Sequence, residues 1–159
     1  MSSRRRARER GTIRLDLTVQ TAVASPGLPR KPALRRWLAA ALDRDACITV
    51  RYVGTAEGRR LNLAYRGRDY ATNVLSFGYG ADAGGHTEGD IVLCAPVVRR
   101  EARAQKKTLT AHVAHLTVHG ALHLQGYDHA KSRAAVRMET LEKEILAALG
   151  FADPYADKA

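Results

Sequence analysis

The spacing of apolar residues along the N-terminal part of the chain predicts strands that alternate with helices. Apolar and polar residues alternate over residues 12–20, a period of two that predicts a strand with one face in solvent. Apolar residues at intervals of three and four then predict a helix from Pro32 to Leu42, and a second helix capped by Thr55 and ended by Gly67. A glycine-rich loop is expected at 78–86. Three further strands are predicted: 47–53, 72–77 and 89–94.

Three helices are predicted after the last of these strands. The first begins at Pro96, the second is capped by Thr108 or Thr110, and the third runs from Ser132 to Leu149. The second is apolar on nearly all sides, which predicts burial at the centre of the domain. The order of elements predicts an α+β fold, a small mixed four-stranded sheet with helices around a buried central helix.

The length of the chain, 159 residues, fits one domain, which we expect to span residues 12–152. Residues 1–11 are predicted to be a disordered basic arm, and residues 153–159 a C-terminal tail. The arm contains five Arg and one Glu against a net charge of +10 for the whole chain, so the domain is basic as well. This charge favours a polyanionic partner.

No stretch of the sequence predicts a membrane span or a signal peptide. The apolar runs are all shorter than the roughly 20 residues that a membrane helix needs. Cys47 and Cys94 match no metal-binding spacing and are interpreted as reduced thiols buried in strands. We therefore expect a soluble cytoplasmic protein without a membrane partner.

The stretch with the most specific chemistry is HGALHLQGYDH, residues 119–129, in the predicted central helix and the loop behind it. His119 and His123 are four residues apart, so their rings project from one face of a helix. Gly126 suits the left-handed conformation that ends a helix, and the turn there brings His129 back towards the pair. Three imidazoles on one ion leave a fourth position for water, as in catalytic zinc sites. The stretch predicts a hydrolytic site with one zinc ion.

Gly120 distinguishes this stretch from the metzincin peptidase motif, H-E-x-x-H-x-x-G-x-x-H. It replaces the general-base glutamate of that motif, so peptide hydrolysis is not expected. The simplest alternative is that His119, His123 and His129 are core residues. A lone helix rarely buries several imidazoles without partners, which favours the metal.

Other polar residues near this stretch are assigned supporting roles. His112 and His115 lie on the same helix, and we expect them to hydrogen-bond neighbouring groups or to line the cleft, although His115 has the spacing of a competing ligand. Asp90 and Asp128 are candidates for a general base, or for holding a ligand histidine through its second ring nitrogen, since such histidines usually donate to an oxygen. The alternative for both aspartates is a role in a turn.

Four stretches of the sequence, taken together, resemble the YbeY family of bacterial rRNA maturation factors. They are TNVLSF (72–77), GDIVLC (89–94), HGALHLQGYDH (119–129) and LEKEILAALGFADPY (141–155). The resemblance implies a zinc-dependent endoribonuclease specific for single-stranded RNA, which acts in 16S rRNA 3′-end maturation and ribosome quality control with the ribosome or small-subunit proteins as partners. It also implies that His119, His123 and His129 bind the zinc ion and that Arg66, in LNLAYRG, is functional. Where the family usually has Pro after TNVLSF, this chain has Gly78-Tyr79.

Arg66 and His119 are the residues that we expect to be catalytic. Zinc lowers the pKa of bound water from about 15.7 towards about 7, and Arg66 would offer a planar fork of donors to the phosphoryl oxygens. Water and the RNA 2′-hydroxyl are both possible nucleophiles, and Arg66 as a plain surface charge at a helix end is the alternative to its phosphate role. Two other functions stay open: a non-catalytic rRNA or ribosome assembly factor with structural zinc, and another metal-dependent hydrolase, such as a peptidase or deaminase.

Overall fold

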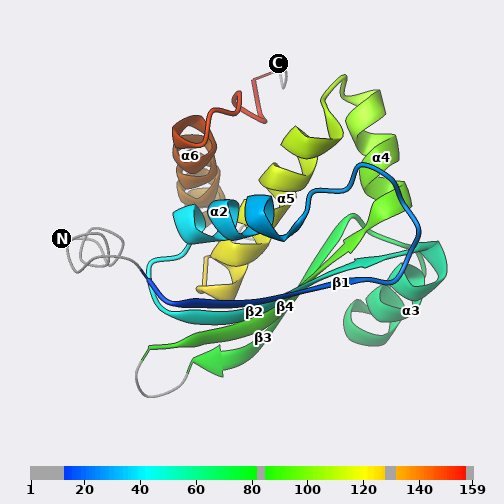
Figure 1. Cartoon of the computed structure of the whole chain (residues 1–159), viewed down its shortest axis with the longest axis horizontal. Helices are drawn as coiled ribbons and strands as arrows, with labels where there is room; N and C mark the ends of the chain where they lie inside the picture. The colour runs from blue at the N-terminus through cyan, green and yellow to red at the C-terminus, as the bar shows by residue number, and fades with distance from the viewer. Residues whose placement is uncertain (1–12, 82–84, 128–131, 157–159) are drawn as a thin grey trace.

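The fold is built on a four-stranded mixed sheet, seen in the computed structural model, which describes residues 13–81, 85–127 and 132–156 (Figure 1). The strands are β1 (Leu15–Thr21), β2 (Ala46–Val53), β3 (Val74–Ala81) and β4 (Thr87–Cys94). They lie in the order β1-β2-β4-β3, with β1, β2 and β4 parallel and β3 antiparallel to β4 at one edge. The predicted α+β class and mixed sheet are confirmed.

Five helices of the described part of the chain surround the sheet. They are α2 (Lys31–Ala41), α3 (Thr55–Arg66), α4 (Ala95–Ala104), α5 (Leu109–Leu124) and α6 (Ser132–Ala148). α5 lies across one face of the sheet between α2 and α6 and contacts β3 and β4, whereas α3 lies on the opposite side (Figure 1). None of these helices is long and apolar enough to cross a membrane.

Strand β4 contributes side chains to an apolar cluster on each face of the sheet. Ile91 and Leu93 belong to the main core under α5, while Val92 and Cys94 belong to a smaller cluster beside α3. Successive side chains of a strand point to opposite faces, so a strand covered on both faces becomes a continuous apolar run. This explains the unbroken apolar sequence of 91–94.

Helix α5 is buried at the centre of the domain, as predicted. Of the two candidate caps, Thr108 is the one used, because its hydroxyl oxygen accepts a hydrogen bond from the Ala111 backbone N–H at 3.0 Å. At Gly120 the helix lies so close to the sheet that a Cβ atom would come within 3.0 Å of Ser76 Oγ and 3.2 Å of Ile91 Cγ2. The close packing leaves little room for the peptidase glutamate at this position.

Several predictions about the strands and the second helix were wrong in detail. The loop expected at 78–86 is partly strand, since β3 continues to Ala81 and Gly78 pairs with Gly89; backbone pairing needs no large side chains. Thr55 is the first residue of α3 and Gly54 takes the cap position. Cys94 is buried as expected, but Cys47 is exposed, because it shares a face with Asp16 and Glu88 at the end of the sheet away from α3.

Candidate functional site

His119 and His123 lie one turn apart at the C-terminal end of α5, as their spacing predicts. Their ring centroids are 4.6 Å apart with an angle of 78° between the planes, and both rings line a cleft of about 730 Å³. The third predicted ligand, His129, lies outside the described residues. Among the residues that are described, no group of three His, Cys, Asp or Glu is placed to hold a metal ion. The zinc site therefore stays a prediction.

The cleft follows the edge strand β3 and brings Arg66 to the same site as the histidine pair. Arg66 is the last residue of α3, which ends because Gly67 adopts the left-handed conformation at φ 70°. Tyr65 and Arg66 line the cleft together with residues 72–79 and the end of α5. The structure thus places three of the predicted site residues, Arg66, His119 and His123, in one cavity although they come from two different helices.

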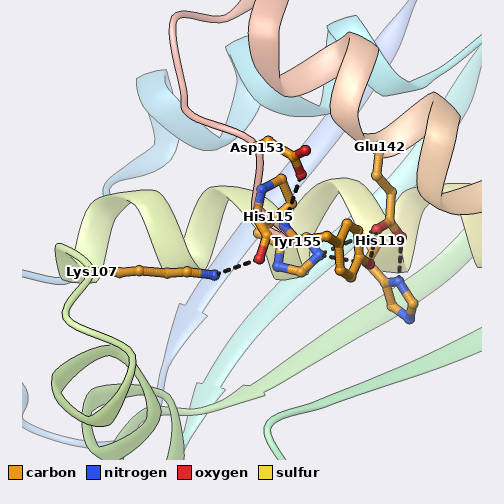
Figure 2. A network of polar contacts seen from close by, with 7 residues as sticks. Lys107, His115, His119, Glu142, Asp153 and Tyr155 are labelled. Atoms are coloured by element: carbon orange, nitrogen blue, oxygen red, sulfur yellow. Dashed lines mark hydrogen bonds and ion pairs between the residues drawn. The ribbon is translucent and has the colours of Figure 1, made fainter. Parts of the chain in front are cut away.

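A buried carboxylate from α6, that of Glu142, contacts His119 (Figure 2). Glu142 is fully buried, and its carboxylate accepts hydrogen bonds from His119 Nδ1, from His115 Nε2 at 3.2 Å and from the Tyr155 hydroxyl. Because Nδ1 of His119 is directed at Glu142, the ring presents Nε2 on its opposite side. A carboxylate bonded to the second nitrogen of an imidazole is the usual support of a metal-binding histidine.

The charges in this network follow from burial and from the hydrogen bonds. Burial raises the pKa of Glu142, but hydrogen bonds from His115, His119 and Tyr155, together with the electrostatic effect of His119, outweigh burial and lower it to about 2. Burial lowers the pKa of His115, and it outweighs the opposing effect of Glu142. Burial and the bond to Glu142 raise the pKa of Tyr155. At neutral pH the carboxylate is therefore an anionic acceptor and the Tyr155 hydroxyl a donor.

Glu142 and Tyr155 belong to the polar network around His119, and the sequence-based reasoning did not identify them. The signal for Glu142 was present, since it lies between Met138 and Ile145 on the apolar stripe of α6, where an ionised side chain needs partners. The predicted role of His115 as a hydrogen-bonding neighbour is confirmed. Of the two aspartates considered for the role of Glu142, Asp90 accepts a hydrogen bond from Tyr79, and Asp128 lies outside the described residues.

A second polar network connects the floor of the cleft to the start of α5. Asn73, which lines the cleft, donates a hydrogen bond through Nδ2 to Glu101 at 2.9 Å, and its Oδ1 accepts one from the backbone N–H of Val74. Glu101 also contacts Nε2 of the buried His112 at 2.9 Å. The strand that forms the cleft wall is therefore tied to both α4 and α5.

Comparison with known proteins gives the same assignment over most of the chain. A family model described as Endoribonuclease YbeY matches residues 31–150. The chain is 58% identical over 151 residues to Endoribonuclease YbeY of Bordetella avium, with 89% of this chain and 93% of the relative covered. It is 56% identical to the protein of the same name from Aromatoleum aromaticum, with 93% of this chain and 97% of the relative covered.

A solved structure agrees with the fold. The solution structure of TM1509 from Thermotoga maritima superposes with a TM-score of 0.53 at 24% sequence identity, covering 87% of this chain and 97% of that one. At this identity the likeness concerns the fold alone, whereas the sequence relatives are far more similar. The chain belongs to the YbeY family of endoribonucleases.

Proposed function

We propose that this chain is a zinc-dependent endoribonuclease that cuts single-stranded RNA and acts in the 3′-end maturation of 16S rRNA and in ribosome quality control. The observation that carries the proposal is the cleft that Arg66 shares with the His119–His123 pair, in a chain whose relatives are named endoribonucleases. Such a role would place the protein in the cytoplasm, with the ribosome or small-subunit proteins as partners. The family assignment confirms the predicted enzyme class, an RNA-cleaving hydrolase.

The donors of the cleft suit a zinc ion. His119, His123 and His129 would hold it, since neutral imidazoles are common zinc ligands and three of them leave one position for a reactant. The buried carboxylate of Glu142 supports this assignment, because it fixes the ring of His119 by one nitrogen and directs the other away. A bound zinc ion would supply a nucleophile at neutral pH without a strong protein base.

Arg66 would act on the RNA backbone. Its guanidinium stays charged at any physiological pH and offers paired N–H donors to two oxygens of one phosphate. Cleavage builds negative charge on those oxygens, so a donor placed beside them lowers the barrier. The exposed position of Arg66 at the end of α3 leaves it accessible to a strand entering the cleft.

The metal and the activity are tested on protein purified without added metal. We expect elemental analysis to find about one zinc ion per chain, and single-stranded RNA to be cut far faster than duplex RNA, casein or nucleosides. A chelator should abolish cutting, and zinc should restore it. The proposal would be refuted if metal-free protein cut RNA at the normal rate, or if the protein hydrolysed casein and left RNA intact.

Two matched pairs of variants separate the site from contaminating nuclease. Arg66→Ala should lower kcat/KM by about 10²-fold or more, while Arg68→Ala, two residues away and also exposed, should not. His123→Ala should lose both zinc and cutting, while His86→Ala should keep both. In cells, replacing the chain by His119→Ala should leave 16S rRNA with unprocessed 3′ ends, whereas a correctly processed 3′ end would remove the rRNA part of the proposal.

A further inference from the structure

Three aromatic rings gather along the same cleft, on the side of the edge strand away from α5. Tyr65 comes from α3, and Phe77 and Tyr79 come from β3; all three line the cleft. The rings of Tyr65 and Phe77 lie 4.7 Å apart between centroids. Tyr65 and Tyr79 are 68% and 66% exposed, which is unusual for large rings beside an established core.

The ring of Tyr79 is held in place although it is exposed. Its hydroxyl donates to the carboxylate of Asp90 on the neighbouring strand. This hydrogen bond is the main cause of the raised pKa of Tyr79, to which burial, the charge of Asp90 and the nearby Tyr65 also contribute. Tyr65 and Tyr79 line the same cleft as Arg66, and both present ring surface to solvent.

We propose that Tyr65, Phe77 and Tyr79 form a stacking platform for unpaired bases of the RNA that enters the cleft. The proposal rests on the proposed function and deepens it, because it explains a preference for single-stranded RNA. Bases inside a duplex are stacked on each other and have no exposed faces, whereas unpaired bases stack on aromatic side chains at little cost. Arg66 beside the platform is placed to bind the phosphate of the same nucleotides.

The basic character of the chain and the polarity of the cleft favour a nucleic acid over an apolar protein segment. The chain carries a net charge of +10, and the aromatic rings share the cavity with Arg66 and the histidine pair rather than forming an isolated apolar patch. Stacking does not depend on base identity, since every base has an aromatic face. We therefore expect the platform to contribute affinity for single strands and little sequence preference.

Binding of a fluorescent single-stranded RNA of about ten nucleotides, measured by anisotropy with the full chain, tests the platform. Tyr79→Ala should weaken binding by about 5- to 150-fold, the range expected for loss of one stacked base. Tyr79→Phe keeps the ring but loses the bond to Asp90 that holds it, so it should weaken binding clearly less than Tyr79→Ala. Tyr70→Ala is the control, because Tyr70 is 53% exposed and is not among the residues that line the cleft.

An abasic strand of the same length separates stacking from phosphate contacts. The wild type and Tyr79→Ala should bind it equally, because it offers the phosphates without bases. The platform alone is refuted if the wild type binds and cuts RNA and Tyr79→Ala binds the RNA equally well. It is also refuted if Tyr79→Ala weakens binding of the abasic strand as much as binding of normal RNA. Failure of the wild type to bind or cut any RNA would instead refute the proposed function, and the platform with it. Thermal melting of each variant shows that binding changes do not arise from unfolding.

Discussion

Replacing Glu142 tests whether the buried carboxylate both stabilises the fold and positions His119. Glu142→Ala removes the acceptor of three hydrogen bonds, from His115, His119 and Tyr155, and leaves their donors in an interior where water replaces the lost partner poorly. Removing one partner of a buried charged network typically costs about 3–5 kcal/mol. Each unsatisfied donor alone accounts for about 1–3 kcal/mol. His119 is partly accessible to water, so we expect the total to stay within the range of about 3–5 kcal/mol.

The loss would be large for a domain of this size. Total stabilities of about 5–15 kcal/mol are usual, and for a chain of this length about 1 kcal/mol shifts the melting temperature by about 2–4 °C. We therefore expect Glu142→Ala to melt about 6–20 °C below the wild type. Glu142→Gln keeps the volume and one acceptor oxygen, so its cost should be about 1–2 kcal/mol.

The assay combines urea unfolding of the metal-free protein with zinc affinity from competition against a chromophoric chelator. Loss of a carboxylate behind a ligand histidine typically weakens metal binding by about 10–100-fold, so Glu142→Gln should bind zinc that much more weakly. Glu144→Gln, the same substitution at an exposed position of α6, is the control. If Glu142→Gln matches Glu144→Gln in both stability and zinc affinity, the network does not position His119.

Three further predictions concern packing, pH and the metal. Gly89→Ala should lower the free energy of unfolding by about 1–3 kcal/mol in urea unfolding, since its Cβ would lie 2.8 Å from the Phe77 carbonyl oxygen. Gly78→Ala, at the paired position on β3, should be nearly neutral in the same assay, because its Cβ would meet no atom closer than 3.7 Å. Burial raises the pKa of Glu101, but hydrogen bonds from His112 and Asn73 outweigh it and the net pKa is lowered, so the stabilisation is present above the unfolded value of 4.5 and is lost as the pH falls through the folded pKa. Glu101→Gln should cost about 1 kcal/mol at pH 6 and make the loss of stability below pH 4.5 less steep, with the share due to Glu142 retained; a mutant with the full wild-type pH dependence would show that Glu101 does not contribute to it. Zinc at 100 times its Kd should stabilise the wild type by about 2.7 kcal/mol in a thermal melt, and a chelator should reverse this stabilisation. Zinc should not stabilise His123→Ala; equal stabilisation of both proteins would show that the metal binds elsewhere.

Much of the fold followed from local patterns in the sequence. Apolar patterns, together with glycine, proline and capping residues, located every strand and helix described here, and Thr108, Gly67 and Gly126 have the capping or left-handed conformations expected of them. The errors arose where the structure of a residue depends on which strand pairs with it or which helix covers it. Gly78 is in a strand because β4 pairs with it, and Cys47 is exposed because α3 covers only one end of that face.

The sequence by itself determined that His119 and His123 share one helix face, because a four-residue spacing fixes their relation through the geometry of the helix alone. Only the tertiary structure decided what surrounds them. Glu142 reaches His119 from a separate helix, and Arg66 arrives from α3 across the edge of β3. Such contacts depend on how helices and sheet pack, and no periodicity within a single element encodes which side chains will meet across that packing.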